Sequence, residues 1–188
     1  MKIKSNKFLI IPSIRMIKDL SYALTLDNEY VLLSEIHIGN LKSFVDMCHK
    51  ANKKVVVNAE LIGGLNLDKI GINMLKNLYC VDMVICSSTI KLNMIKNVGL
   101  ETMQRITLMD SKSLDDSLKT LADSKCDLIE VRPAIYGLKF IDKIRQIKDV
   151  PIFLGGFVEK LEIIDAAKKV GIVGVTTSCK DLWGSKTK

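Results

Sequence analysis

Several features that would assign a chemistry at once are missing from this 188-residue sequence. Aromatic residues make up only 5% of the chain, so a stacking platform for single-stranded bases is not evident. The sequence contains no Walker A loop, no Gly-x-Gly-x-x-Gly fingerprint and no Gly-x-Ser-x-Gly elbow. It therefore gives no motif-based support for nucleotide binding or for serine-hydrolase activity. The longest apolar run falls well short of the roughly 18 residues that a membrane span needs. We therefore expect a cytoplasmic protein with no membrane partner.

The cysteine and histidine content gives little support to a metal site. Five cysteines are odd in number and include no Cys-x-x-Cys pair, so in a reducing cytoplasm they are interpreted as small apolar residues. His37 and His49 are the only histidines, and the acidic residues near predicted strand ends match no metal-ligand spacing. We expect no metal and no cofactor.

The formal net charge of +7 comes mainly from lysine, because only four of the 28 basic residues are arginines. Such a balance favours contact with phosphates, either in nucleic acid or in a small ligand, although it is also common in ordinary soluble proteins. The charge permits RNA binding without demonstrating it.

Apolar runs with β propensity alternate along the chain with stretches of helical periodicity, such as residues 41–51, 113–122 and 161–170. This alternation is typical of parallel strands with crossover helices. The predicted strand cores are residues 8–11, 30–33, 54–58, 83–86, 102–108, 128–131, 151–154 and 172–175. Eight such units predict an α/β fold, a compact single-domain (β/α)8 TIM barrel with short loops over residues 1–188. A doubly wound open sheet is the competing fold, and eight units in so short a chain favour closure.

The last two predicted strands each end in residues suited to a phosphate. Gly155 and Gly156 follow one strand, and Thr176, Thr177 and Ser178 end the other. Glycines allow backbone N–H groups to approach an anion, and the hydroxyls add donors. In TIM barrels the loops after strands seven and eight often form a phosphate pocket. The alternative is that the glycines make only a tight turn and the hydroxyl residues only cap a helix.

Polar side chains also follow the other predicted strands, at the end of the barrel where sites of this fold lie. The candidates for the pocket are Asn58, Glu60, Asp110, Glu130 and Arg132. Carboxylates inside a barrel are costly unless they are paired or hydrogen-bonded, so their convergence suggests a polar site. A purely structural ion pair between Glu130 and Arg132 is the alternative. Neither interpretation requires catalysis, and no catalytic residue is assigned.

Longer motifs resemble the glycerol-3-phosphate-responsive antiterminator family, and the similarity extends over almost the whole chain. The motifs are Val57 to Leu65, Gln104 to Ser111, Ile129 to Pro133, Gly155-Gly156 and Thr176 to Ser178. The resemblance implies a TIM barrel that binds the leader mRNA of a glycerol-utilisation operon when glycerol-3-phosphate is present. It assigns no RNA-binding residue. Effector binding would order loops or shift an interface of a homo-oligomer.

Three segments depart from the family's usual pattern. The chain has Asn58-Ala59-Glu60-Leu61 where the family often has His-Ala-Asp-Leu, and Cys86-Ser87-Ser88 where Ser-Thr-Lys is common. Arg132-Pro133-Ala134 replaces Leu-Pro-Gly. The lost lysine removes a cation that Arg132 would supply instead. The effector is expected to be glycerol-3-phosphate or a related phosphometabolite.

Two other functions are compatible with the same residues. A small TIM-barrel enzyme acting on a phosphorylated glycerol- or sugar-type metabolite would use Glu60 and Glu130 as acid and base. A scaffold without a ligand would act through an oligomer surface.

Overall fold

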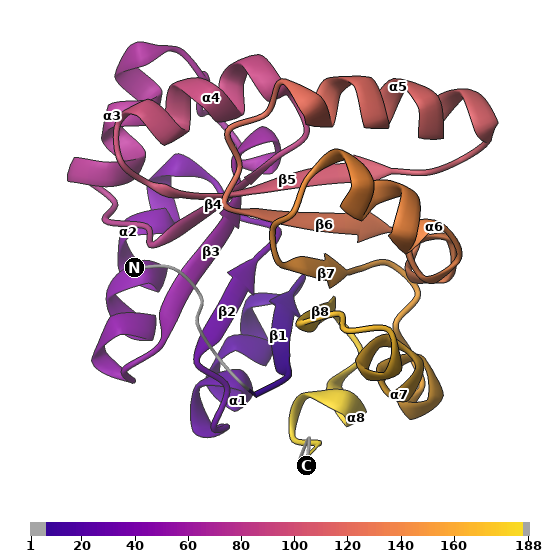
Figure 1. Ribbon diagram of the computed structural model, residues 1–188. Helices are drawn as coiled ribbons and strands as arrows, with labels where there is room; N and C mark the ends of the chain where they lie inside the picture. The colour runs from indigo at the N-terminus through magenta and orange to yellow at the C-terminus, as the bar shows by residue number, and fades with distance from the viewer. Residues whose placement is uncertain (1–6, 186–188) are drawn as a thin grey trace.

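The computed structural model describes residues 7–185 as a closed ring of eight parallel strands, each followed by a helix (Figure 1). The predicted (β/α)8 barrel is confirmed, while the two ends of the predicted 1–188 domain lie outside the described residues. The strands are β1 Leu9–Ile14, β2 Tyr30–Leu33, β3 Lys54–Asn58, β4 Met83–Cys86, β5 Glu101–Thr107, β6 Leu128–Arg132, β7 Ile152–Leu154 and β8 Gly174–Thr177. The first and last strands pair with each other, which closes the barrel.

The helices cover the outside of the ring (Figure 1). They are α1 Leu20–Thr25, α2 Ile38–Lys50, α3 Lys69–Asn77, α4 Thr89–Asn97, α5 Ser111–Ala122, α6 Ala134–Ile147, α7 Leu161–Lys169 and α8 Lys180–Trp183. Two 3-10 turns, η1 Ile17–Asp19 and η2 Ala59–Leu61, lie in the connections after β1 and β3. In residues 7–185 we find no helix with the length and apolar character that crossing a membrane requires.

The first strand is longer than the sequence predicts. It runs through Pro12 to Ile14 instead of ending at Ile11. The register explains how a proline is accommodated, because β1 pairs with β8 up to Pro12 and with β2 only from Ser13 onward. The other predicted strands agree with the observed ones to within about two residues, as is usual for element ends.

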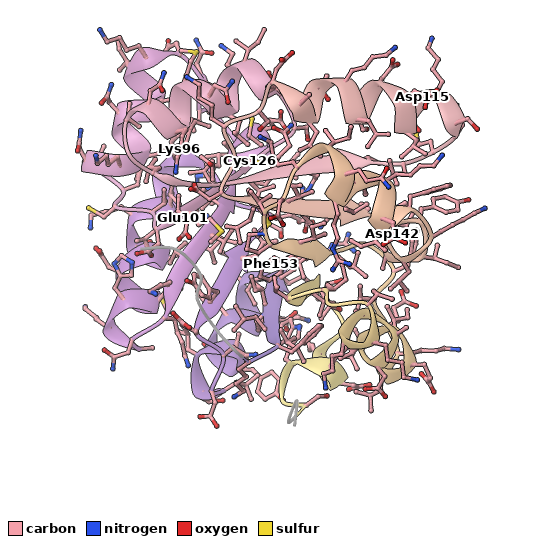
Figure 2. The ribbon with its side chains drawn as sticks, in the orientation of Figure 1. Lys96, Glu101, Asp115, Cys126, Asp142 and Phe153 are labelled. Carbon is pink, nitrogen blue, oxygen red and sulfur yellow. The ribbon has the colours of Figure 1, made fainter. Side chains whose placement is uncertain are left out.

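The inside of the barrel is filled by large apolar side chains. They are Ile11, Tyr30, Leu32, Val56, Met83, Ile85, Met103, Leu128 and Phe153. Phe153 has no exposed surface, and Figure 2 shows it in the middle of the ring, whereas Asp142 lies outside on α6. Gly174 makes room for this ring, since a Cβ there would lie 2.5 Å from a Phe153 ring carbon. The narrow barrel is therefore a packed core and not a channel.

Successive inward-facing positions change from apolar to polar toward the carboxyl ends of the strands. The pleat places residues i and i+2 on the same face. Met103 is thus followed on the inner face by Arg105, and Leu128 by Glu130. On β3, Val56 is followed in the same way by Asn58. The apolar core consequently ends in a polar layer at the mouth of the barrel.

Candidate phosphate-binding site

A cavity of about 350 Å³ opens above this polar layer, at the carboxyl ends of the strands. Its position is the one where ligand sites of TIM barrels lie. Residues at the ends of several strands and in the connections that follow them contribute to it: Ser13, Arg15, Ser34, Glu35, Asn58, Leu61, Arg105, Arg132, Gly156, Phe157, Val158, Glu159, Thr176, Thr177 and Ser178. Three of the chain's four arginines line this one cavity, which favours an anionic ligand.

Glu130 lies beneath the cavity with no exposed surface. Its Oε2 accepts a hydrogen bond from Arg105 Nε and lies 3.3 Å from Arg132 Nε, and its Oε1 accepts one of 2.5 Å from the Thr176 hydroxyl. Burial opposes the charge of this carboxylate, but the two guanidinium groups outweigh burial and keep the pKa of Glu130 below its ordinary value. Glu130 is therefore ionised, and its carboxylate orients the guanidinium groups of both arginines.

Gly155 is needed for this cluster to pack. A Cβ at this position would lie 2.6 Å from Thr176 Oγ1, 2.8 Å from Glu130 Oε1 and 3.0 Å from Arg132 Nε. The first two distances are shorter than real Cβ atoms show, so a side chain at Gly155 would displace the cluster. The predicted glycine pair thus divides in two, with Gly155 packed against the cluster and Gly156 lining the cavity.

The end of β8 is fixed by hydrogen bonds to its surroundings. The Thr177 hydroxyl donates to the Val158 carbonyl at 2.6 Å and accepts from the Cys179 N–H at 3.0 Å. The buried indole of Trp183 donates to the Thr177 carbonyl at 2.8 Å, which ties α8 to the strand. Of the three predicted hydroxyl residues, Thr176 and Thr177 are buried in such contacts, and Ser178 is exposed in the cavity wall.

The mouth of the cavity carries weaker polar contacts. The hydroxyls of Ser13 and Ser34 lie 2.7 Å apart. Arg15 and Glu35 form an ion pair of 3.5 Å in which both side chains are mostly exposed. Exposed pairs of this kind contribute about 0 to 1 kcal/mol, so Arg15 is free to exchange its partner for a ligand.

Three of the predicted pocket residues lie outside the cavity lining: Glu130 beneath it, as described above, and Glu60 and Asp110 in the surrounding loops. Glu60 follows the end of β3 in η2, and its two carboxylate oxygens accept the N–H groups of Ser87 and Ser88 at 3.0 Å. Burial opposes its charge, but these backbone donors keep the pKa of Glu60 below its ordinary value. Asp110 caps α5, where its carboxylate accepts the Ser113 N–H at 2.7 Å. Both carboxylates therefore stabilise loops in this structure.

Sequence reasoning did not assign Arg105 and Arg15 to the site. The direction of Arg105 depends on the register of β5, and its pairing opposite Glu130 places it inside the barrel. The alternation from Met103 to Arg105 is the signal that identifies it once Met103 is known to face inward. Arg15 follows a strand that is longer than predicted, so its place at the mouth could not be read from the sequence.

The closed barrel and the cavity at the carboxyl ends of its strands define a TIM-barrel protein with an arginine-lined mouth. The sequence profile of the glycerol-3-phosphate responsive antiterminator family matches residues 10–183, and the chain belongs to that family. A glycerol uptake operon antiterminator regulatory protein from Listeria monocytogenes str. 4b F2365 is 29% identical in sequence. Its crystal structure superimposes with a TM-score of 0.90 over 97% of this chain and 98% of that one.

Two further proteins are similar to this chain. The crystal structure of a glycerol uptake operon antiterminator-related protein from Thermotoga maritima MSB8 is 22% identical, with a TM-score of 0.83 over 95% of this chain and 99% of that one. The uncharacterized protein YgcP of Escherichia coli (strain K12) is 27% identical over 92% of this chain and 91% of its own length. The likeness to the Thermotoga structure concerns the fold alone.

Proposed function

We propose that this protein is a transcriptional antiterminator that binds the leader mRNA of a glycerol-utilisation operon in response to glycerol-3-phosphate. The observation that carries the proposal is the convergence of Arg105 and Arg132 on one cavity in a chain of this family. A regulator of transcripts acts in the cytoplasm, which agrees with the composition of the chain.

The cavity offers complementary groups to both parts of the effector. The guanidinium of Arg132 and the hydroxyl of Ser178 would bind the phosphate, next to the backbone of Gly156. The Asn58 amide and the hydroxyl of Ser13, both in the cavity wall, would bind the glycerol hydroxyls. Three arginines against two glutamates in the lining give a positive balance, which suits an anion. Related phosphometabolites of similar size share these requirements.

The contacts of the two candidate acid and base residues favour a regulator over an enzyme. A general acid or base works best with a pKa near the operating pH. The pKa values of Glu130 and Glu60 are both shifted downward, and their oxygens are occupied by arginine, threonine and backbone donors. Neither carboxyl group is therefore prepared to exchange a proton with a ligand.

Effector binding and RNA binding must be linked if the protein acts as a switch. A coupling free energy of about 1 to 3 kcal/mol corresponds to a change in RNA affinity of roughly 5- to 150-fold. The test is fluorescence anisotropy of labelled leader RNA, titrated with protein in the presence of glycerol-3-phosphate, glycerol or inorganic phosphate. We expect tighter binding with glycerol-3-phosphate only, and a steep loss of affinity as salt is added.

The matched variant for this experiment is Arg132→Met. It should keep the RNA affinity that the wild-type protein has without effector and lose the response to glycerol-3-phosphate. RNA binding that is indifferent to the effector in the wild-type protein would contradict the proposal.

A further inference from the structure

Large apolar side chains gather on the face of the barrel where the cavity opens. In the described part of the chain fifteen such side chains are exposed, and twelve of them lie between the end of a strand and the third residue of the following α-helix. We call these twelve the apolar rim: Met16, Ile17, Tyr22, Ile38, Leu61, Ile70, Ile90, Met109, Ile135, Tyr136, Phe157 and Leu161. They come from seven of the eight connections that lead from a strand to a helix, so the rim surrounds the cavity.

The rim holds most of the exposed large apolar side chains in residues 7–185. Ile90, Met109, Ile135 and Phe157 each keep between 69% and 77% of their surface in water. A large aromatic side chain carries roughly 150 to 250 Å², so twelve half-exposed large side chains amount to on the order of 1,000 Å². A partner that covers this face would remove that apolar area from water.

Phe157 adds an independent observation. Its backbone has a φ of +58°, in the left-handed region that suits glycine or asparagine, and its ring is 77% exposed. Packing of the ring within this chain therefore offsets little of the cost of that backbone conformation. Strain of this kind is common at functional sites, and contact of the ring with a partner would offset it.

The charges on the same face argue against a nucleic acid as the partner. The segments that carry the rim, with the connection after β8, hold seven lysines and arginines against eight aspartates and glutamates. The positive excess of the chain therefore lies elsewhere. RNA affinity depends on uncompensated cations, whereas a neutral, mixed-charge, apolar face suits protein.

We infer that a second copy of this chain docks on the apolar rim, so that two barrels associate mouth to mouth. An isologous dimer uses the same patch on both copies, and a mixed-charge face can complement itself about a two-fold axis. A stable interface needs about 800 Å² from each partner, which the rim provides. Because Leu61 and Phe157 belong to both the rim and the cavity lining, the partner covers the mouth of the site.

The test is sedimentation velocity of the full chain from low to high micromolar concentration, without effector or RNA. Its outcome is thus independent of the proposed regulatory function. The variant is Ile90→Asp with Ile135→Asp, two positions outside the cavity lining. Each lies in the first turn of a helix, where an acidic residue is favourable, so the fold should persist. The control is Met47→Glu with Ile147→Glu, two exposed apolar residues outside the rim.

We expect the wild-type protein and the control variant to sediment as dimers, and the rim variant to dissociate with a dissociation constant raised by roughly tenfold or more. A wild-type protein that is monomeric at every concentration would overturn the inference. Equal dissociation of the rim and control variants would do the same. If the wild-type protein is monomeric and the rim variant no longer binds leader RNA, the rim is an RNA-binding surface. The proposal that a second copy docks there would then be wrong.

Discussion

Arg105 and Glu130 face each other across neighbouring strands, in register, and form a buried ion pair at the floor of the cavity. Their side chains are only 8% and 0% exposed. An ion pair buried this deeply connects the stability of the barrel to the geometry of the site, because the same carboxylate also contacts Arg132 and Thr176. Changes to either partner should therefore be visible in both unfolding and binding.

Replacing Glu130 with glutamine should destabilise the protein strongly. The change leaves the buried guanidinium of Arg105 without its counter-ion, and breaking such a pair by removing one partner costs about 3 to 5 kcal/mol. Denaturant unfolding measures the effect. The control is Glu159→Gln at the cavity mouth, which should change the free energy of unfolding by less than about 0.5 kcal/mol. Equal stability of the two variants would contradict the anchoring role of Glu130.

Stability should fall in acid in a defined window. The pKa of Glu130 is lowered from 4.5, and that of Asp127 is lowered from 3.8 because the contacts with Lys96 and Thr102 outweigh burial. A carboxyl group that is more acidic in the folded chain than in the unfolded chain binds fewer protons when folded. Its stabilisation is complete above the unfolded pKa and is lost as the pH falls through the folded pKa.

The measurement is the free energy of unfolding from about pH 6 down to about pH 3. We expect it to decrease below about pH 4.5, and the decrease should be shallower in Asp127→Asn, which lacks one of the titrating groups. An unfolding free energy that stays constant or rises in this range would show that these carboxylates are not stabilised as ions.

Replacing each of the two glycines after β7 with alanine should have different effects on stability and effector binding. Gly155→Ala places a Cβ inside the Glu130 cluster, so we expect a loss of about 1 to 3 kcal/mol and weaker effector binding. At Gly156 a Cβ would meet nothing nearer than 3.6 Å, and only the φ of +71° is unfavourable, which costs about 1 kcal/mol. Thermal melting and effector titration distinguish the two variants. A Gly155→Ala protein that behaves like the wild type would show that the cluster adapts.

The sequence predicts the barrel well because its strands are long apolar runs covered on both faces, and their alternation with helices determines the topology. The sequence places Asn58, Arg132, Gly156 and Ser178 at one end of the barrel because every parallel strand ends there, and all four line the cavity in the structure. Which of them enters the cavity depends on register and local turns. Glu60 illustrates this, because η2 interrupts the period-two alternation after Asn58 and turns the carboxylate toward the loop after β4.

The most direct measurement is thermal melting of the purified protein titrated with glycerol-3-phosphate, with glycerol and inorganic phosphate as controls. A ligand at a hundred times its dissociation constant stabilises the folded state by about 2.7 kcal/mol, which raises the melting temperature by several degrees. We expect a saturable rise with glycerol-3-phosphate that is much reduced in Arg132→Met. No rise, or an equal rise in the variant, would contradict an effector site built on the arginine-lined cavity.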